Sequence, residues 1–242
     1  MDRFFPIMND DTEKGMHFAL LAYWIFAFWF IPFWLPLVGA DYWHNYPVIA
    51  WFEIAYHLLN CLVVALMLKT YLIDSFLNVQ IDPKGFFKVV GWSALVMLGL
   101  AAGLYCFLGP MMMDIYPLSE MAVALTSGFL VANQPVFGTI CYTLFTPFAV
   151  VGLFYASGFA PVCRRNRWLG YLVVTVLLAL PCAFDILWRS QSSLVIPTFI
   201  LQLPMHWIAC WTYQKADTIW APIATVAIFN LVTSLMALIV NF

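Results

Sequence analysis

The sequence has little charge. Asp, Glu, Lys and Arg make up only 9% of the 242 residues, whereas soluble domains carry roughly 25%. The formal net charge is −2, and no basic cluster is large enough to bind a nucleic acid. We therefore expect neither a soluble domain nor a nucleic-acid interface.

Several patterns that mark metal or nucleophile chemistry are missing. The six cysteines form no CxxC pair, which argues against a disulfide framework or a zinc finger. The chain also has no HExxH pair and no GxSxG motif. No internal repeat, low-complexity stretch or long linker divides it. We predict one integral membrane domain over residues 1–242, with no metal and no cofactor.

Long apolar stretches are abundant, and hydrophobic residues make up 64% of the chain. Seven stretches each have about the ~20 residues that a helix needs to cross a bilayer. They are residues 16–38, 47–68, 87–108, 135–159, 168–188, 194–213 and 219–241. The sequence predicts an all-α fold, namely a polytopic transmembrane helix bundle of about seven spans.

The basic residues fall into alternate connections between these stretches. Nine of the ten would lie on one side of the membrane, and they are Arg3, Lys14, Lys69, Lys84, Lys88, Arg164, Arg165, Arg167 and Lys215. Basic residues resist translocation, so this side is predicted to be cytoplasmic. We expect a multi-pass protein of the cell membrane with a cytoplasmic N-terminus.

Residues 109–134 depart from this pattern. Prolines and polar residues bracket a mildly apolar piece, residues 119–131, that is short for a span. We expect a short surface or re-entrant helix there. The alternative, an eighth span, would put the Arg-rich connection at 160–167 outside, which fits the charge pattern less well.

Polar residues inside the apolar stretches are the candidates for function, because an ionised group costs roughly 2.5–3.5 kcal/mol at the bilayer centre. Helical spacing places three of them on one face of the second stretch, two on the sixth and one on the seventh. If these stretches are neighbours, the six residues form a buried polar pocket: Glu53, His57, Asn60, Gln202, His206 and Asn230. The alternatives are hydrogen bonds that only join helices, a ligand or peptide pocket, and a zinc site.

The tail of the chain carries a family resemblance. The segment Tyr213–Ile223 and the following Phe229-Asn230-Leu231 resemble the end of the CPBP family, the CAAX prenyl endopeptidases and bacteriocin-processing membrane proteins. Trp220, Pro222 and Asn230 match that pattern. The resemblance implies a protein of the bacterial inner membrane.

The catalytic pattern of that family is not kept. Its EExxxR motif has no acid here in residues 148–152, its FxxxH motif has no counterpart histidine near Asp185, and Val226 stands where the histidine of its HxxxN motif belongs. Valine cannot serve as a general base. The resemblance thus implies a pseudoenzyme without catalytic residues, a non-catalytic scaffold or regulator of a partner membrane protein.

Two other functions remain open at this stage. One is an active intramembrane peptidase whose catalytic groups have moved to Glu53, His57 and His206. The other is a small transporter or ligand-binding bundle that uses the same polar face. Convergence of the six polar residues would favour these two over the scaffold.

Overall fold

In a computed structural model we describe residues 10–30, 46–112, 131, 134–179 and 195–240. These residues are helical almost throughout and include no strand, which confirms the predicted all-α class. The elements, with η for a π-helical segment, are α1 (Asp10–Ile25), η1 (Phe26–Phe30), α3 (Tyr46–Met67), α4 (Lys69–Ile81), α5 (Pro83–Met112), α8 (Pro135–Ile140), η2 (Cys141–Phe145), η3 (Pro147–Gly152), η4 (Tyr155–Phe159), α9 (Ala160–Arg165), α10 (Arg167–Val174), η5 (Thr175–Ala179), α12 (Val195–Ala216) and α13 (Trp220–Val240).

Three helices in the described part of the chain are long and apolar enough to cross a membrane. Their apolar segments are Ala50–Met67, Pro83–Leu104 and Pro135–Cys163. Shorter apolar helices cover Phe18–Phe28, Arg167–Leu178 and Trp220–Met236. Large apolar side chains such as Leu66, Trp92 and Phe107 are exposed, as is usual for helices that face lipid. The structure is therefore compatible with a membrane protein.

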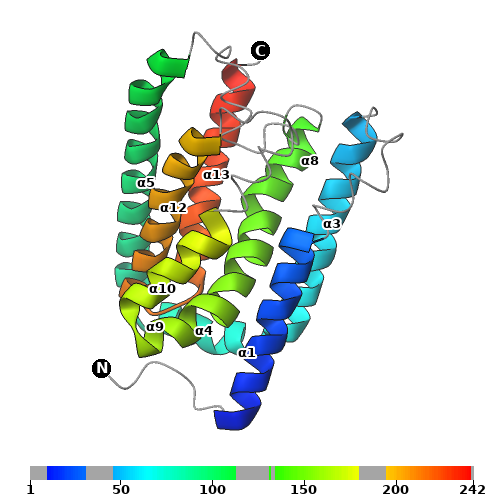
Figure 1. The fold of residues 1–242 in the computed structure, drawn as a ribbon, viewed down its shortest axis with the longest axis vertical. Coiled ribbons are helices and arrows are strands. Elements are labelled where there is room, and N and C mark those ends of the chain that lie inside the picture. The colour runs from blue at the N-terminus through cyan, green and yellow to red at the C-terminus, as the bar shows by residue number, and fades with distance from the viewer. Residues whose placement is uncertain (1–9, 31–45, 113–130, 132–133, 180–194, 241–242) are drawn as a thin grey trace.

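A central helix organises the bundle. The segments from α8 to α9 form one continuous helix over residues 135–165, and every residue from 151 to 160 is buried. Fifteen of residues 135–163 are buried, compared with four of residues 83–104 in α5. The central helix lies between α1 and α3 on one side and α10, α12 and α13 on the other (Figure 1).

Aromatic side chains fill the space around the lower half of the central helix. Trp24 of α1 packs against Phe154, with ring centroids 5.0 Å apart. On the opposite side, Tyr155 and Phe159 contact Tyr213 of α12 at 5.9 and 5.7 Å. All five side chains are buried in one hydrophobic cluster that joins the N-terminal and C-terminal helices.

Two connections differ from what the sequence indicated. Residues 69–81, which carried no span and were treated as a connection, form α4. The Arg-rich connection expected at 160–167 is helical apart from Asn166, whose φ of −152° and ψ of 117° break the helix. The Asn166 side chain then accepts bonds from the backbone N–H groups of Trp168 and Leu169 and caps α10. The short helix predicted at 119–131 lies outside the described residues, except for Val131.

Candidate functional site

The polar candidates on α3 face two different neighbours. Asn60 is buried, and its Oδ1 accepts a bond of 2.6 Å from the Tyr23 hydroxyl of α1. Its Nδ2 donates to the backbone oxygen of Tyr56 at 2.9 Å. Tyr56 in turn donates its hydroxyl to the carbonyl of Ala27. Asn60 therefore helps to join α3 to α1.

Glu53 and His57 lie nearer the central helix. The Glu53 carboxylate is half-buried and interacts electrostatically with the Cys141 thiol of η2. The Nδ1 atom of His57 is buried and has no hydrogen-bond partner within the described part of the chain. An unsatisfied ring nitrogen at this depth is unusual and costs free energy unless a ligand meets it.

The candidates on α12 and α13 are placed on the other side of the central helix. Asn230 is buried and donates its Nδ2 to the backbone oxygen of Tyr142 at 2.9 Å. On α12, Gln202 is half-buried, and the Nε2 atom of His206 is buried with no hydrogen-bond partner among the described residues. The backbone oxygen of His206 accepts a bond of 3.1 Å from the Tyr155 hydroxyl.

The structure thus brings α3 and α13 to the same turns of the central helix, η2 and η3, from opposite sides. Glu53 interacts electrostatically with Cys141, and Asn230 bonds to Tyr142, the residue that follows Cys141 in the chain. Gln202 and His206 belong to α12, which packs against α5, α13 and η5. Among the residues that the structure describes, no group of three or more His, Cys, Asp and Glu side chains is placed to hold a metal ion.

A dense hydrogen-bonded cluster, absent from the sequence-based predictions, joins α4 to the turn between α12 and α13. We call it the α4 clasp, formed by Ser75 and Asn78 of α4 with Asp217 and Thr218 of the turn and the neighbouring Ile219. Ser75 Oγ lies 2.9 Å from Thr218 Oγ1 and accepts from the Ile219 N–H at 2.9 Å. Thr218 Oγ1 donates to the Ser75 carbonyl at 2.8 Å, and Asn78 Nδ2 donates to the Asp217 carbonyl at 2.8 Å.

Aromatic residues extend the α4 clasp into the bundle. The indole nitrogen of Trp220 donates to the Leu72 carbonyl at 3.0 Å, and its ring lies between Phe76 and Phe148. This segment is part of the stretch that carries the family resemblance. Leu72, Ser75 and Val79, which recur at helical spacing, form the buried face of α4.

Asp217 has an unusual environment within the α4 clasp. Its φ of 52° places the backbone in the left-handed region, where Asp and Asn are tolerated better than most residues. The Oδ2 atom is buried and has no hydrogen-bond partner in the part of the chain that the structure describes, and burial raises the pKa of this carboxyl to about 7. Asp217 is therefore a carboxyl that can change its protonation near neutral pH.

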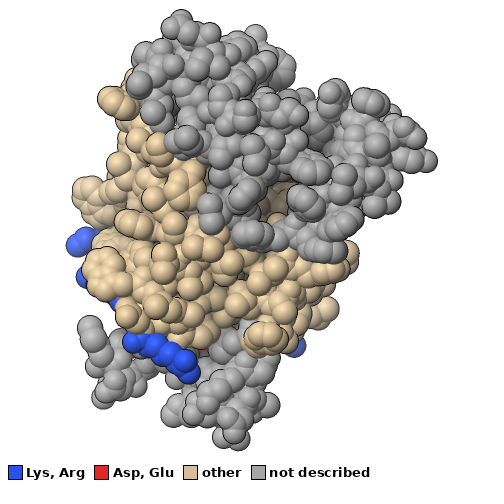
Figure 2. All heavy atoms as spheres, viewed as in Figure 1, with Lys and Arg blue, Asp and Glu red and all other residues tan. Residues whose placement is uncertain are grey.

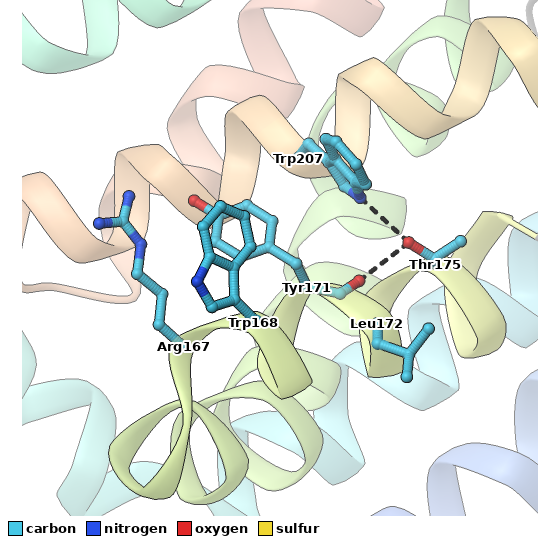
Figure 3. Close-up of a pocket in the computed structure, with 6 residues that line it drawn as sticks. All are labelled: Arg167, Trp168, Tyr171, Leu172, Thr175 and Trp207. Atoms are coloured by element: carbon cyan, nitrogen blue, oxygen red, sulfur yellow. Dashed lines mark hydrogen bonds between the residues drawn. The ribbon is translucent and has the colours of Figure 1, made fainter.

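A surface groove lies between α10 and α12. It has a volume of about 480 Å³ and is lined by Arg167, Trp168, Tyr171, Leu172, Thr175 and Trp207 (Figure 3). The Trp207 indole N–H donates to Thr175 Oγ1 at 3.0 Å, and that hydroxyl donates to the Tyr171 carbonyl at 2.9 Å. The guanidinium carbon of Arg167 lies 5.9 Å from the Tyr171 ring centroid. The groove is thus aromatic with one cationic end.

Comparison of the chain with protein-family models, with curated proteins and with solved structures finds no match. The resemblance to the CPBP family therefore stays a prediction that rests on the tail motif and, more loosely, on the hundred residues before it.

Proposed function

We propose that the chain is a multi-pass membrane protein that acts as a non-catalytic scaffold or regulator of another membrane protein. It would be a pseudoenzyme relative of the CPBP proteases in the bacterial inner membrane. The observation that carries this proposal is the packing at the positions where that family holds its catalytic groups.

Those positions lie in an apolar environment. Val151 is 4% exposed, and Val150 and Val226 pack against the same hydrophobic cluster. At Gly152, even an added Cβ atom would lie 3.2 Å from the side chain of Ile223. A water-activating site needs polar groups and space for a water molecule. This packing favours a structural role for the segment.

The residue that matches the family's motif, Asn230, also has a structural role here. Its amide donates to a backbone oxygen of the central helix and so ties α13 to η2. Cross-helix bonds of this kind stabilise membrane bundles by about 0.6 kcal/mol on average. Asn230 can therefore be explained by helix packing.

The charge distribution supports seven spans with a cytoplasmic N-terminus. Lys and Arg atoms are visible in the lower part of the molecule, where α4 and α9 lie, and α13 ends at the opposite end (Figures 1 and 2). The basic residues of the described helices occur near the points where α1, α4, α5 and α10 begin and where α9 and α12 end. This arrangement agrees with the rule that basic residues stay inside.

Three measurements test the proposal. The purified protein should cleave no prenylated or leader peptide, and a photo-crosslinker placed at exposed positions of α5, such as Trp92, should capture one membrane protein of defined mass. Cleavage that is lost in Glu53→Gln or His206→Ala would contradict the proposal and establish a peptidase with a relocated site. Labelling of a cysteine at position 165 from outside intact cells would overturn the orientation.

The relocated peptidase is the second candidate, and a specific observation favours it. Two buried histidine nitrogens, Nδ1 of His57 and Nε2 of His206, have no partner in the described residues. Unsatisfied buried polar atoms are often explained by a ligand or by catalysis. The cleavage assay above separates this candidate from the scaffold.

A further inference from the structure

The groove between α10 and α12 changes in character along its length. Arg167 lies at the first residue of α10, and Thr175 follows eight residues later. At a rise of about 1.5 Å per residue, these two residues are separated by about 12 Å along the helix axis. That length is close to the hydrocarbon depth of one leaflet, which is half of about 30 Å. The groove thus has a cationic end, and the length of its apolar part is close to the thickness of one leaflet.

The polar groups along the walls of the groove already form hydrogen bonds within the protein. The Trp207 indole N–H and the Thr175 hydroxyl bond to each other, and the Tyr171 hydroxyl donates to Gln214 Oε1 at 3.4 Å. The walls therefore offer mainly ring faces and the Leu172 side chain. At the end of the groove, the exposed Arg167 guanidinium hydrogen-bonds to the Tyr171 side chain and has further donors in the same plane that suit a phosphate group. None of the six lining residues is acidic.

We propose that this groove binds one anionic glycerophospholipid of the cytoplasmic leaflet. The lipid phosphate contacts Arg167, and an acyl chain lies along Trp168, Tyr171, Leu172 and Trp207. This assignment rests on the membrane placement proposed above and is independent of whether the protein is a scaffold or a peptidase.

The shape and chemistry of the groove fit a lipid better than a helix of a partner protein. Helices that dock in membranes use small residues that let the backbones approach. This groove has bulky walls instead: the exposed fractions are 77% for Trp168, 58% for Leu172 and 44% for Trp207. Tryptophan beside a basic residue is typical of the interface between lipid headgroups and hydrocarbon.

The test is native mass spectrometry of the full chain in detergent micelles. The probes are phosphatidylglycerol, phosphatidylcholine with the same acyl chains, and inorganic phosphate. The variants are Arg167→Gln, Leu172→Trp, which fills the groove and keeps the charge, and Arg165→Gln. Arg165 is exposed and lies outside the groove, so its substitution is the matched charge control.

We expect one retained phosphatidylglycerol, bound about tenfold more tightly than phosphatidylcholine. Both lipids carry a phosphate, but the quaternary ammonium of phosphatidylcholine offsets its charge, whereas phosphatidylglycerol brings a net negative charge to Arg167. Arg167→Gln should remove this preference, Leu172→Trp should weaken the binding of both lipids, and Arg165→Gln should change the affinity by less than about twofold. Equal retention of the two lipids by the unsubstituted protein would overturn the proposal. So would equal losses in the two arginine variants, unchanged binding in Leu172→Trp, or displacement of the lipid by millimolar inorganic phosphate.

Discussion

Hydrogen bonds between helices differ in density between two regions of this molecule. At the α4 clasp, four bonds or close hydroxyl contacts involve Ser75, Asn78 and the turn. Between residues inside the helices, single side-chain bonds join neighbours, such as Thr212 Oγ1 to Ser93 Oγ at 2.7 Å between α12 and α5. Backbone N–H and C=O groups inside a helix bond to each other, whereas those at a helix end have no partner within the helix. The turn between α12 and α13 therefore needs hydrogen-bond partners that a helix interior does not need.

The largest effect is expected from Ser75→Ala. Ser75 is buried and accepts the bond of the Ile219 N–H at the start of α13. Its removal strands that donor, which costs about 1–3 kcal/mol. We expect the free energy of unfolding in mixed micelles to fall by about 2 kcal/mol.

Thr70→Ala is the matched control, since it removes an exposed hydroxyl from the same helix. It should change the unfolding free energy by less than about 0.5 kcal/mol. If the two variants are equally stable, the α4 clasp does not stabilise the turn more than a surface hydroxyl does.

Asp217→Asn should have an intermediate effect that depends on pH. The folded carboxyl has a pKa of about 7, whereas Asp in an unfolded chain titrates near 3.9, so the folded state binds the proton more tightly. The protonated carboxyl contributes its full share to the free energy of unfolding below about pH 4. This contribution falls as the pH rises from about 4 to about 7, and above about pH 7 it is lost. The Asn amide carries no charge, so the variant does not lose this contribution. We expect its free energy of unfolding to be higher by about 1 kcal/mol at pH 8 and unchanged at pH 4. The value is smaller than the pKa difference alone would give, because Asp217 is only half-buried and water screens its charge.

The measurement is thermal unfolding of both proteins from pH 4 to pH 8. Asn tolerates the left-handed backbone at this position, so the change tests the charge alone. Asp74→Asn makes the same change in net charge on α4. An equal gain in that variant would assign the effect to overall charge and not to the environment of Asp217.

The smallest effect is expected from Thr212→Val inside α12. The Ser93–Thr212 bond is a single contact between buried hydroxyls, and such bonds average about 0.6 kcal/mol in membrane proteins. A double-mutant cycle with Ser93→Ala should give a coupling of about that size. A coupling as large as the loss in Ser75→Ala would remove the contrast between the two regions.

The positions of the long helices could be predicted because their length and apolarity are local properties of the sequence. The α4 clasp could not, since Ser75 and Thr218 are 143 residues apart and neither belongs to a recognisable motif. Asn230 is buried, and its partner is the backbone oxygen of Tyr142, which no side-chain pattern reveals. The groove was missed for a similar reason, because Trp207 comes from a different helix from Arg167 and Trp168.

The complete burial of residues 151–160 has a consequence for how the protein is made. The central helix is synthesised in the middle of the chain, after α1 and α3 but before α10, α12 and α13. In the proposed membrane setting, the side of the central helix that contacts α1 and α3 can pack as soon as the helix enters the bilayer. The opposite side faces lipid until α10, α12 and α13 have been translated. An incomplete chain would therefore expose Tyr155 and Phe159, whose partner Tyr213 comes later. Quality-control proteases of the membrane would have a defined target in chains that stop short of α12.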